Sequence, residues 1–133
     1  MKCLLDTHTW IWSQQSPEMM GTQTVDIVTD MSFPLYVSTI STLEIARLVK
    51  TGVIELTGSL KNWITKAVDA LACSTVEISH AIAMEAYDLP GRFHKDPADR
   101  ILVATARLLK LSILTADERI LRYRHVHSVD ART

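Results

Sequence analysis

The stretch D-P-A-D-R-I-L-V-A-T-A-R-L-L-K-L-S-I-L-T-A-D at residues 96–117 contains the alternation that decides the fold. Asp96 before Pro97 is typical of a helix start, because aspartate caps free backbone amides and proline suits the first helical position. Residues that can pack inward then recur at helical spacing: Ile101, Ala104, Thr105 and Leu108. The pattern predicts a helix over residues 97–110, followed at once by a short apolar strand over 112–115.

The rest of the chain repeats this alternation of short strands and helices. Strands are predicted at residues 2–6, 35–40, 75–78 and 125–129. Helices are predicted at residues 8–13, 17–30, 41–50, 57–73, 79–88 and 117–123. In the helix at 41–50 we expect Leu43, Ala46 and Val49 to form the buried face. The sequence thus predicts an α/β fold, a central parallel sheet flanked by helices, as one domain over residues 1–133.

Composition narrows the class of protein. The chain has 133 residues, 47% of them hydrophobic, which is enough for a core. Its net charge of −1 gives no overall attraction for a polyanion, so any nucleic-acid contact must come from a local cluster of Lys and Arg. Cys3 and Cys73 lack the spacing of metal ligands and are expected to be buried thiols. No apolar run is long enough to span a membrane and no signal pattern is present, so we expect a cytoplasmic protein.

Four acidic residues lie where predicted strands end or predicted helices begin: Asp6, Glu44, Asp99 and Asp117. In a parallel sheet with right-handed crossovers, all strand-to-helix loops emerge at one edge, where ligand sites of such sheets lie. The four carboxylates are therefore expected to meet. Gathered carboxylates repel one another unless a divalent cation sits among them, and all-oxygen ligation favours Mg²⁺ or Mn²⁺. The sequence leaves open whether one ion or two would bind.

Helix capping is the alternative explanation for these acids. Ser41-x-x-Glu44 has the pattern of a capping box, and Asp99 falls in a first helical turn, where the helix dipole favours negative charge. Asp6 has no such role in the predicted structure, because it ends an apolar strand. We therefore expect Asp6 to anchor the metal site.

Other polar residues beside the acids have two interpretations each. Thr7, Ser41 and Thr115 can orient a carboxylate or bond the local backbone, and Arg100 can contact phosphate or form a salt bridge. Asp96 is expected to be a cap rather than a ligand. Basic residues near the same edge are candidates for phosphate contacts, with a solvated surface as the alternative: Arg47, Lys50, Arg92, His94 and Lys95. His125 and His127 alternate like a strand face and are expected to be structural.

Four motifs make the chain similar to PIN-domain ribonucleases, and specifically to VapC-type toxins of bacterial toxin–antitoxin modules. They are L-L-D-T-H-T-W at 4–10, L-Y-V-S-T-I-S-T-L-E-I-A at 35–46, H-K-D-P-A-D-R-I-L-V-A-T-A at 94–106 and I-L-T-A-D-E-R-I at 113–120. They occur in family order over nearly the whole chain. Leu43 stands where an aromatic residue is frequent in the family, and Ala98 where a bulkier residue is frequent, but the acids are intact.

The resemblance implies a PIN-like three-layer fold and Mg²⁺- or Mn²⁺-dependent cleavage of single-stranded regions of RNA. It implies that Asp6, Glu44, Asp99 and Asp117 form the acidic site, with Asp6 and Asp99 as direct ligands and Glu44 acting through water or on the nucleophile. Asp117 corresponds to the more variable fourth position. The resemblance also implies a cognate antitoxin and a homodimer.

Two other functions fit parts of the sequence. A non-catalytic PIN-like binding module would share the fold, but it has no need to keep four mutually repelling acids. A phosphotransfer domain of flavodoxin-like type also gathers acids at a sheet edge. That chemistry favours a second Asp beside the first and a Lys at a late strand end, whereas Thr7 and His8 follow Asp6 here.

Overall fold

A five-stranded parallel sheet forms the centre of the protein, for which a computed structural model describes residues 1–133. Its strands are β1 (Cys3–Leu5), β2 (Leu35–Ser38), β3 (Ser74–Val76), β4 (Ser112–Thr115) and β5 (Ser128–Asp130). They lie in the order β3-β2-β1-β4-β5, and every neighbouring pair is parallel. The predicted parallel sheet is confirmed, with β1 at its centre.

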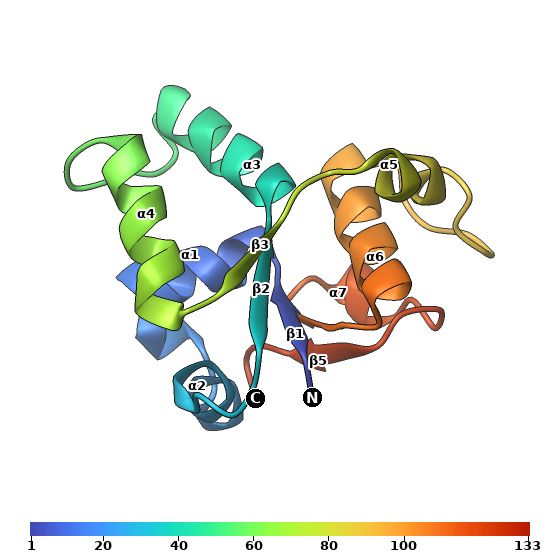
Figure 1. Ribbon diagram of the computed structural model, residues 1–133, viewed down its shortest axis with the longest axis horizontal. Helices are drawn as coiled ribbons and strands as arrows, with labels where there is room; N and C mark the ends of the chain where they lie inside the picture. Colours follow the sequence, from blue (N-terminus) through green and yellow to red (C-terminus); the bar gives the residue numbers. More distant parts are fainter.

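Helices cover both faces of this sheet, which gives three layers (Figure 1). One side carries α1 (Thr7–Gln15), the 3₁₀ helix η1 (Pro17–Met19), α2 (Thr22–Thr29), α3 (Thr39–Lys50) and α4 (Leu60–Leu71). The other side carries α5 (His80–Ala86), α6 (Pro97–Leu109) and α7 (Glu118–Leu121). No helix is long and apolar enough to cross a membrane.

The core has two halves, one on each face of the sheet. Because side chains alternate along a strand, Cys3 and Leu5 pack with α1 to α4, whereas Leu4 packs with α5 and α6. All three are fully buried, as expected for a parallel strand covered on both faces. In the first half, Trp10 and Trp63 meet edge to face with ring centroids 5.7 Å apart, an arrangement that adds about 0.5–1.5 kcal/mol to simple area burial.

The helix and strand predicted from residues 96–117 are confirmed. Asp96 caps α6 by accepting hydrogen bonds from the amides of Ala98 and Asp99, and Pro97 occupies the first turn. The buried face of α6 is wider than the four residues predicted, because the helix packs on the sheet and also contacts α3 and α5. Leu108 instead remains 42% exposed.

The prediction of one helix over residues 17–30 is wrong. The chain forms η1, becomes extended at Met20, and starts α2 after Gly21. Gly21 lies directly against Thr133: a β-carbon at this position would stand 2.2 Å from its backbone. The break therefore follows from a contact between segments far apart in the sequence.

Several further boundaries also differ from the prediction, and two of them place candidate residues differently. Helix α3 begins two residues earlier than expected, with Ser38 as its cap, so Ser41 is inside the helix and Glu44 lies in its second turn. The buried residues of α3 are then Ile40, Ser41, Ile45 and Leu48, and the expected Leu43 is 64% exposed. His125 and His127 precede β5 rather than belonging to it.

Candidate metal centre

The four predicted acids line one cavity of about 380 Å³. Asp6 follows β1, Glu44 projects from α3, Asp99 lies in the first turn of α6, and Asp117 precedes α7. The prediction that four separate segments deliver carboxylates to one region is confirmed by this arrangement. The other residues that line the cavity are Thr7, His8, Trp12, Arg47, Asp96, Leu102, Ala116 and Arg119.

Asp6 is the most buried of the four, with 7% of its surface exposed. One carboxylate oxygen accepts a hydrogen bond from the Thr9 amide at 2.8 Å, and the other accepts one from the Thr115 hydroxyl. Burial raises the pKa of Asp6, although these hydrogen bonds oppose the rise. The expectation that Asp6 has no capping role is wrong, because it is the N-cap of α1.

Glu44 does not cap α3, contrary to the capping-box alternative. Its Oε1 accepts a hydrogen bond from the Thr7 hydroxyl, which in turn lies 2.9 Å from the buried Ser41 hydroxyl. Thr7 therefore orients a carboxylate, which was one of its two predicted roles. Ser41 stands behind Thr7 and does not line the cavity.

Among the four acids, Asp99 shows most clearly that the cavity holds negative charge without matching positive charge. Burial, followed by the negative charges of Asp96, Asp117 and Glu44, raises the pKa of Asp99 to about 7. Its Oδ2 lies 2.9 Å from Nε2 of His94, but the ring N–H does not point at the carboxylate well enough to form a hydrogen bond. Unlike Asp96, the Asp99 carboxylate caps no helix, so its place in the cavity has no structural explanation in α6.

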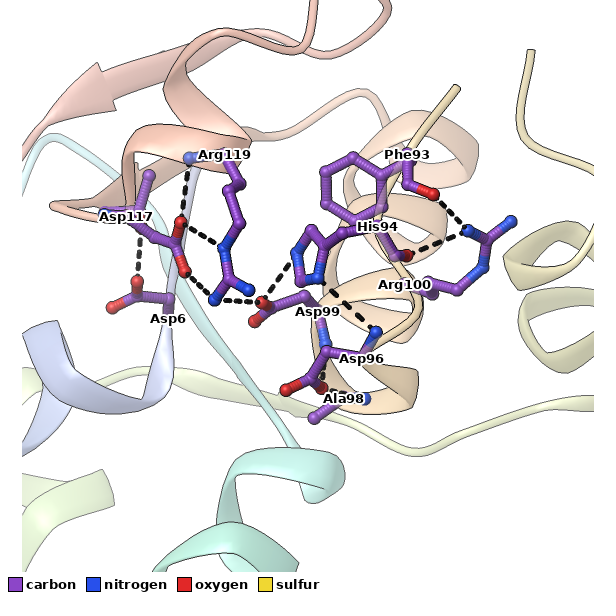
Figure 2. A network of polar contacts seen from close by, with 10 residues as sticks. Asp6, Phe93, His94, Asp96, Ala98, Asp99, Arg100, Asp117 and Arg119 are labelled. Carbon is purple, nitrogen blue, oxygen red and sulfur yellow. Dashed lines mark hydrogen bonds and ion pairs between the residues drawn. The ribbon is translucent and has the colours of Figure 1, made fainter. Parts of the chain in front are cut away.

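Asp117 is the N-cap of α7 and is paired with Arg119. Burial alone would raise the pKa of Asp117, but hydrogen bonds from the side chain and the amide of Arg119 outweigh it, and the pKa is lowered. Nη2 of Arg119 lies 3.0 Å from Oδ2 of Asp117 and 3.7 Å from Oδ2 of Asp99. Figure 2 shows this guanidinium lying between the two carboxylates. It is the nearest positive charge to both.

Comparison with known proteins places the chain in a family. The PIN domain family matches residues 3–126, nearly the whole chain.

This chain belongs to the PIN-domain family.

The resemblance to VapC-type proteins is confirmed as well. The PIN domain is 30% identical, over 129 residues, to the protein named Ribonuclease VapC22 of Mycobacterium tuberculosis, and the match covers 95% of each chain. Its fold is similar to that of VapBC-1 from nontypeable Haemophilus influenzae, with a TM-score of 0.68 and 14% identity over the whole of both chains. It is also similar to a chain of a toxin–antitoxin complex from Klebsiella pneumoniae, with a TM-score of 0.64 and 20% identity over 97% of each chain.

The remaining candidate residues of this PIN domain are divided between three places. Arg47 lines the acidic cavity. Arg100 does not: its guanidinium donates hydrogen bonds to the carbonyls of Ala86, Phe93 and His94, and Figure 2 shows it pointing away from Asp99. Its donors are directed at these backbone carbonyls and no carboxylate lies within 4.0 Å, so the salt bridge considered above does not form. Arg92 lines a separate cavity.

Arg119 is the cavity residue that sequence reasoning missed. Its sequence signal is its position two residues after Asp117, from which it reaches back to the cap. That spacing is common among surface residues, so it becomes informative only when Asp99 is known to lie on the other side.

The donor set of the PIN-domain cavity fits a hard divalent cation in its chemistry. Every acidic side chain offers oxygen, and the pKa of Asp99 is raised first by burial and then by neighbouring negative charge that Arg119 does not balance. The acids are not drawn together around a common point: no three His, Cys, Asp or Glu side chains approach closely enough to surround an ion as they stand. Small side-chain movements, including displacement of Arg119, would be needed for ligation.

Proposed function

We propose that this PIN domain is the toxin component of a type II toxin–antitoxin module and acts as a Mg²⁺- or Mn²⁺-dependent endoribonuclease. Its reaction would be hydrolysis of phosphodiester bonds in single-stranded regions of RNA. The observation that carries the proposal is the convergence of Asp6, Glu44, Asp99 and Asp117 from four segments on one cavity. The name of the relative from Mycobacterium tuberculosis, a ribonuclease, supports it. We include residues 1–133 in one domain.

The proposal gives each acid a role that its surroundings support. Asp6 and Asp99 would hold the ion directly, with Asp117 as a further ligand once Arg119 moves. A bound divalent ion polarises the phosphate and lowers the pKa of a bound water. The Thr115 hydroxyl fixes one oxygen of Asp6, and the Asp99 carboxylate is free of capping bonds.

In the proposed mechanism, Glu44 accepts a proton rather than serving as the main ligand. The Thr7 hydroxyl holds one of its oxygens, which leaves the other available to the attacking water. Arg47 lines the same cavity and can bind a phosphate oxygen through its forked donors. Thr7, backed by Ser41, therefore serves substrate positioning through Glu44.

RNA cleavage with purified variants tests the proposed nuclease. Wild-type protein should cut labelled RNA with Mg²⁺ or Mn²⁺, and EDTA should stop the reaction. Asp6→Asn and Asp99→Asn should lower the rate by roughly 100-fold or more, since each removes charge that stabilises the transition state. Asp69→Asn, on the exposed face of α4, is the matched control and should leave the rate unchanged. Cleavage that persists in both cavity variants would point to a contaminating nuclease and overturn the assignment.

The proposed partners are a cognate antitoxin protein and a second copy of the chain, in the cytoplasm. The similar structures from Haemophilus influenzae and Klebsiella pneumoniae, a VapBC protein and a toxin–antitoxin complex, support an antitoxin. Light scattering of the purified chain, alone and co-expressed with the product of a neighbouring short reading frame, measures both associations. A monomer that co-purifies with no such product would contradict this part of the proposal.

One observation favours a second candidate, a non-catalytic PIN-like binding module. Arg119 already partly neutralises Asp99 and Asp117, and the acids do not surround a common point. Calorimetry with millimolar Mn²⁺ separates the two functions: the nuclease requires heat of binding that Asp99→Asn loses, whereas the binding module predicts none.

A further inference from the structure

A second cavity, of about 500 Å³, lies beside the acidic one and has the opposite charge. Four arginines line it, Arg92, Arg119, Arg122 and Arg124, together with two histidines and no acidic residue. The contrast is sharp in a chain whose net charge is only −1. A local concentration of arginine is the feature that a polyanion requires of such a protein.

Two of the four arginines that line this basic cavity have no ion-pair partner, whereas Arg119 pairs with Asp117 and Arg122 with Glu118. Arg92 and Arg124 are exposed and have no carboxylate within 4.0 Å. Arg122 pairs with Glu118 at 3.7 Å, but 80% of its side chain is exposed, so the pair is weak. Arg92 and Arg124 are therefore free to bind an anion without first breaking an ion pair.

Arg119 joins the two cavities, because its side chain lines both. His94 also connects the two cavities, because it lines the basic cavity and its ring lies against Asp99 in the acidic one. Figure 2 shows both side chains reaching the Asp99 carboxylate. A phosphate in the basic cavity would thus be a close neighbour of one held at the acids.

The aromatic rings that line the basic cavity are fixed by contacts with one another and by hydrogen bonds in the adjoining loop. The rings of Phe93 and Tyr123 lie 4.8 Å apart, and that of His125 lies 5.4 Å from Tyr123. The Tyr123 hydroxyl donates to the Pro90 carbonyl, and Arg100 donates to two carbonyls of the same loop, at 3.0 Å each. Gly91 turns this loop with φ +67°, a backbone angle that other residues adopt with strain. These contacts give the basic cavity a defined shape.

We propose that this cavity binds a phosphate, with its nucleotide, of the RNA strand that flanks the bond cut in the acidic cavity. The inference rests on the proposed nuclease function and adds a binding subsite to it. Acids at the cleavage centre repel a polyanion, so a neighbouring positive site is needed to hold the strand there. The half-buried rings of Phe93 and His125, beside the arginines, leave faces on which a base can stack, which favours RNA over an acidic protein segment.

Fluorescence anisotropy of a labelled single-stranded RNA of about 12 nucleotides measures this binding. The full-length protein is used in EDTA, so that no RNA is cut, at several KCl concentrations. Arg92→Ala/Arg124→Ala should weaken binding about 25-fold at 0.1 M salt and make the slope of log affinity against log salt shallower by about 1.4, the effect of losing two phosphate contacts. Arg92→Lys/Arg124→Lys keeps both charges and should keep the slope.

Lys61→Ala/Lys66→Ala is the matched control, since it removes two exposed charges from α4 on the other side of the sheet. It should bind RNA as the wild type does. If the arginine pair behaves like this control while metal-dependent cleavage persists and depends on Asp99, the subsite is refuted and the nuclease stands. If RNA binding depends on the arginines but no cleavage occurs, the RNA site stands without the nuclease. Poly-glutamate that binds as tightly, with the same arginine dependence, would overturn the preference for RNA.

Discussion

At the scale of the residue, the sequence was wrong about which of the cavity acids cap helices. Asp6 and Asp117 cap helices, whereas Glu44 and Asp99 do not. The sequence predicted where the acids converge, because strand ends and helix starts determine that edge. It could not predict the capping roles, because Asp6 caps a helix that begins at the next residue and α3 begins two residues earlier than its pattern indicates.

The pKa of Asp99 predicts a pH-dependent stability in the metal-free protein. In the folded state this pKa is about 7, whereas in an unfolded chain it is about 3.9. Between these values the folded state holds a proton that the unfolded state releases, so stability falls as pH rises through this window and the full penalty remains above it. In EDTA, the thermal midpoint of the wild type should fall between about pH 5 and about pH 8 more than that of Asp99→Asn. Parallel curves for the two proteins would show that Asp99 titrates normally.

Arg119 is expected to compete with a divalent cation for Asp99 and Asp117. Because 59% of its side chain is exposed, the pairs are weak, and Arg119→Ala should strengthen Mn²⁺ binding only about threefold in calorimetry. The same variant should weaken RNA binding, since Arg119 also lines the basic cavity. Arg122→Ala lacks contact with the cavity acids and should leave Mn²⁺ affinity unchanged. Equal Mn²⁺ affinity in both variants would exclude the competition.

At the scale of the element, the predictions were correct where residues close together in the sequence determine the structure. Asp96 and Pro97 start α6 as predicted, and β4 has the predicted bounds of 112–115. The predictions were wrong where a contact between distant parts of the chain determines a helix boundary. Gly21 is the N-cap of α2 and leaves room for Thr133, which packs against it, a contact that no window of local sequence contains.

Substitution of Asp96 can separate its role as the cap of α6 from the effect of its negative charge. Asp96→Ala removes the acceptor for two amides and should lower the free energy of unfolding by about 1 kcal/mol. Asp96→Asn keeps an equally good cap and should be nearly as stable as wild type in denaturant titration, while removing a charge that raises the pKa of Asp99. A loss of the same size in both variants would mean that the charge, rather than the cap, stabilises the helix start.

At the scale of the whole molecule, the sheet and its two covered faces were predictable from alternation alone, whereas the basic cavity was not. Its arginines come from the loop around Arg92 and from α7 with the segment that follows it, which no shared motif connects. The packing of Tyr123 against Pro90 and Phe93, far apart in the sequence, brings the two segments together.

Metal binding should stabilise the whole fold, because the cavity ligands come from segments distributed along the chain. At a Mn²⁺ concentration about 100 times the Kd, the gain is about 2.7 kcal/mol, visible as a higher thermal midpoint. Asp6→Asn keeps an acceptor for the α1 cap and should lose the gain, whereas Asp69→Asn should keep it. A Mn²⁺ effect that Asp6→Asn retains would place the ion elsewhere.

The central position of β1 sets the order in which the protein can mature during its own synthesis. Asp6 leaves the ribosome first, but its hydrogen-bond partner Thr115 follows 109 residues later, and β1 pairs with β4 only then. At about 5–20 residues per second, the early segments wait seconds without the neighbour that completes the sheet. A translating ribosome therefore carries an unassembled acidic cavity until the segment around Thr115 has been made, and synthesis interrupted before that point yields fragments that lack a complete one.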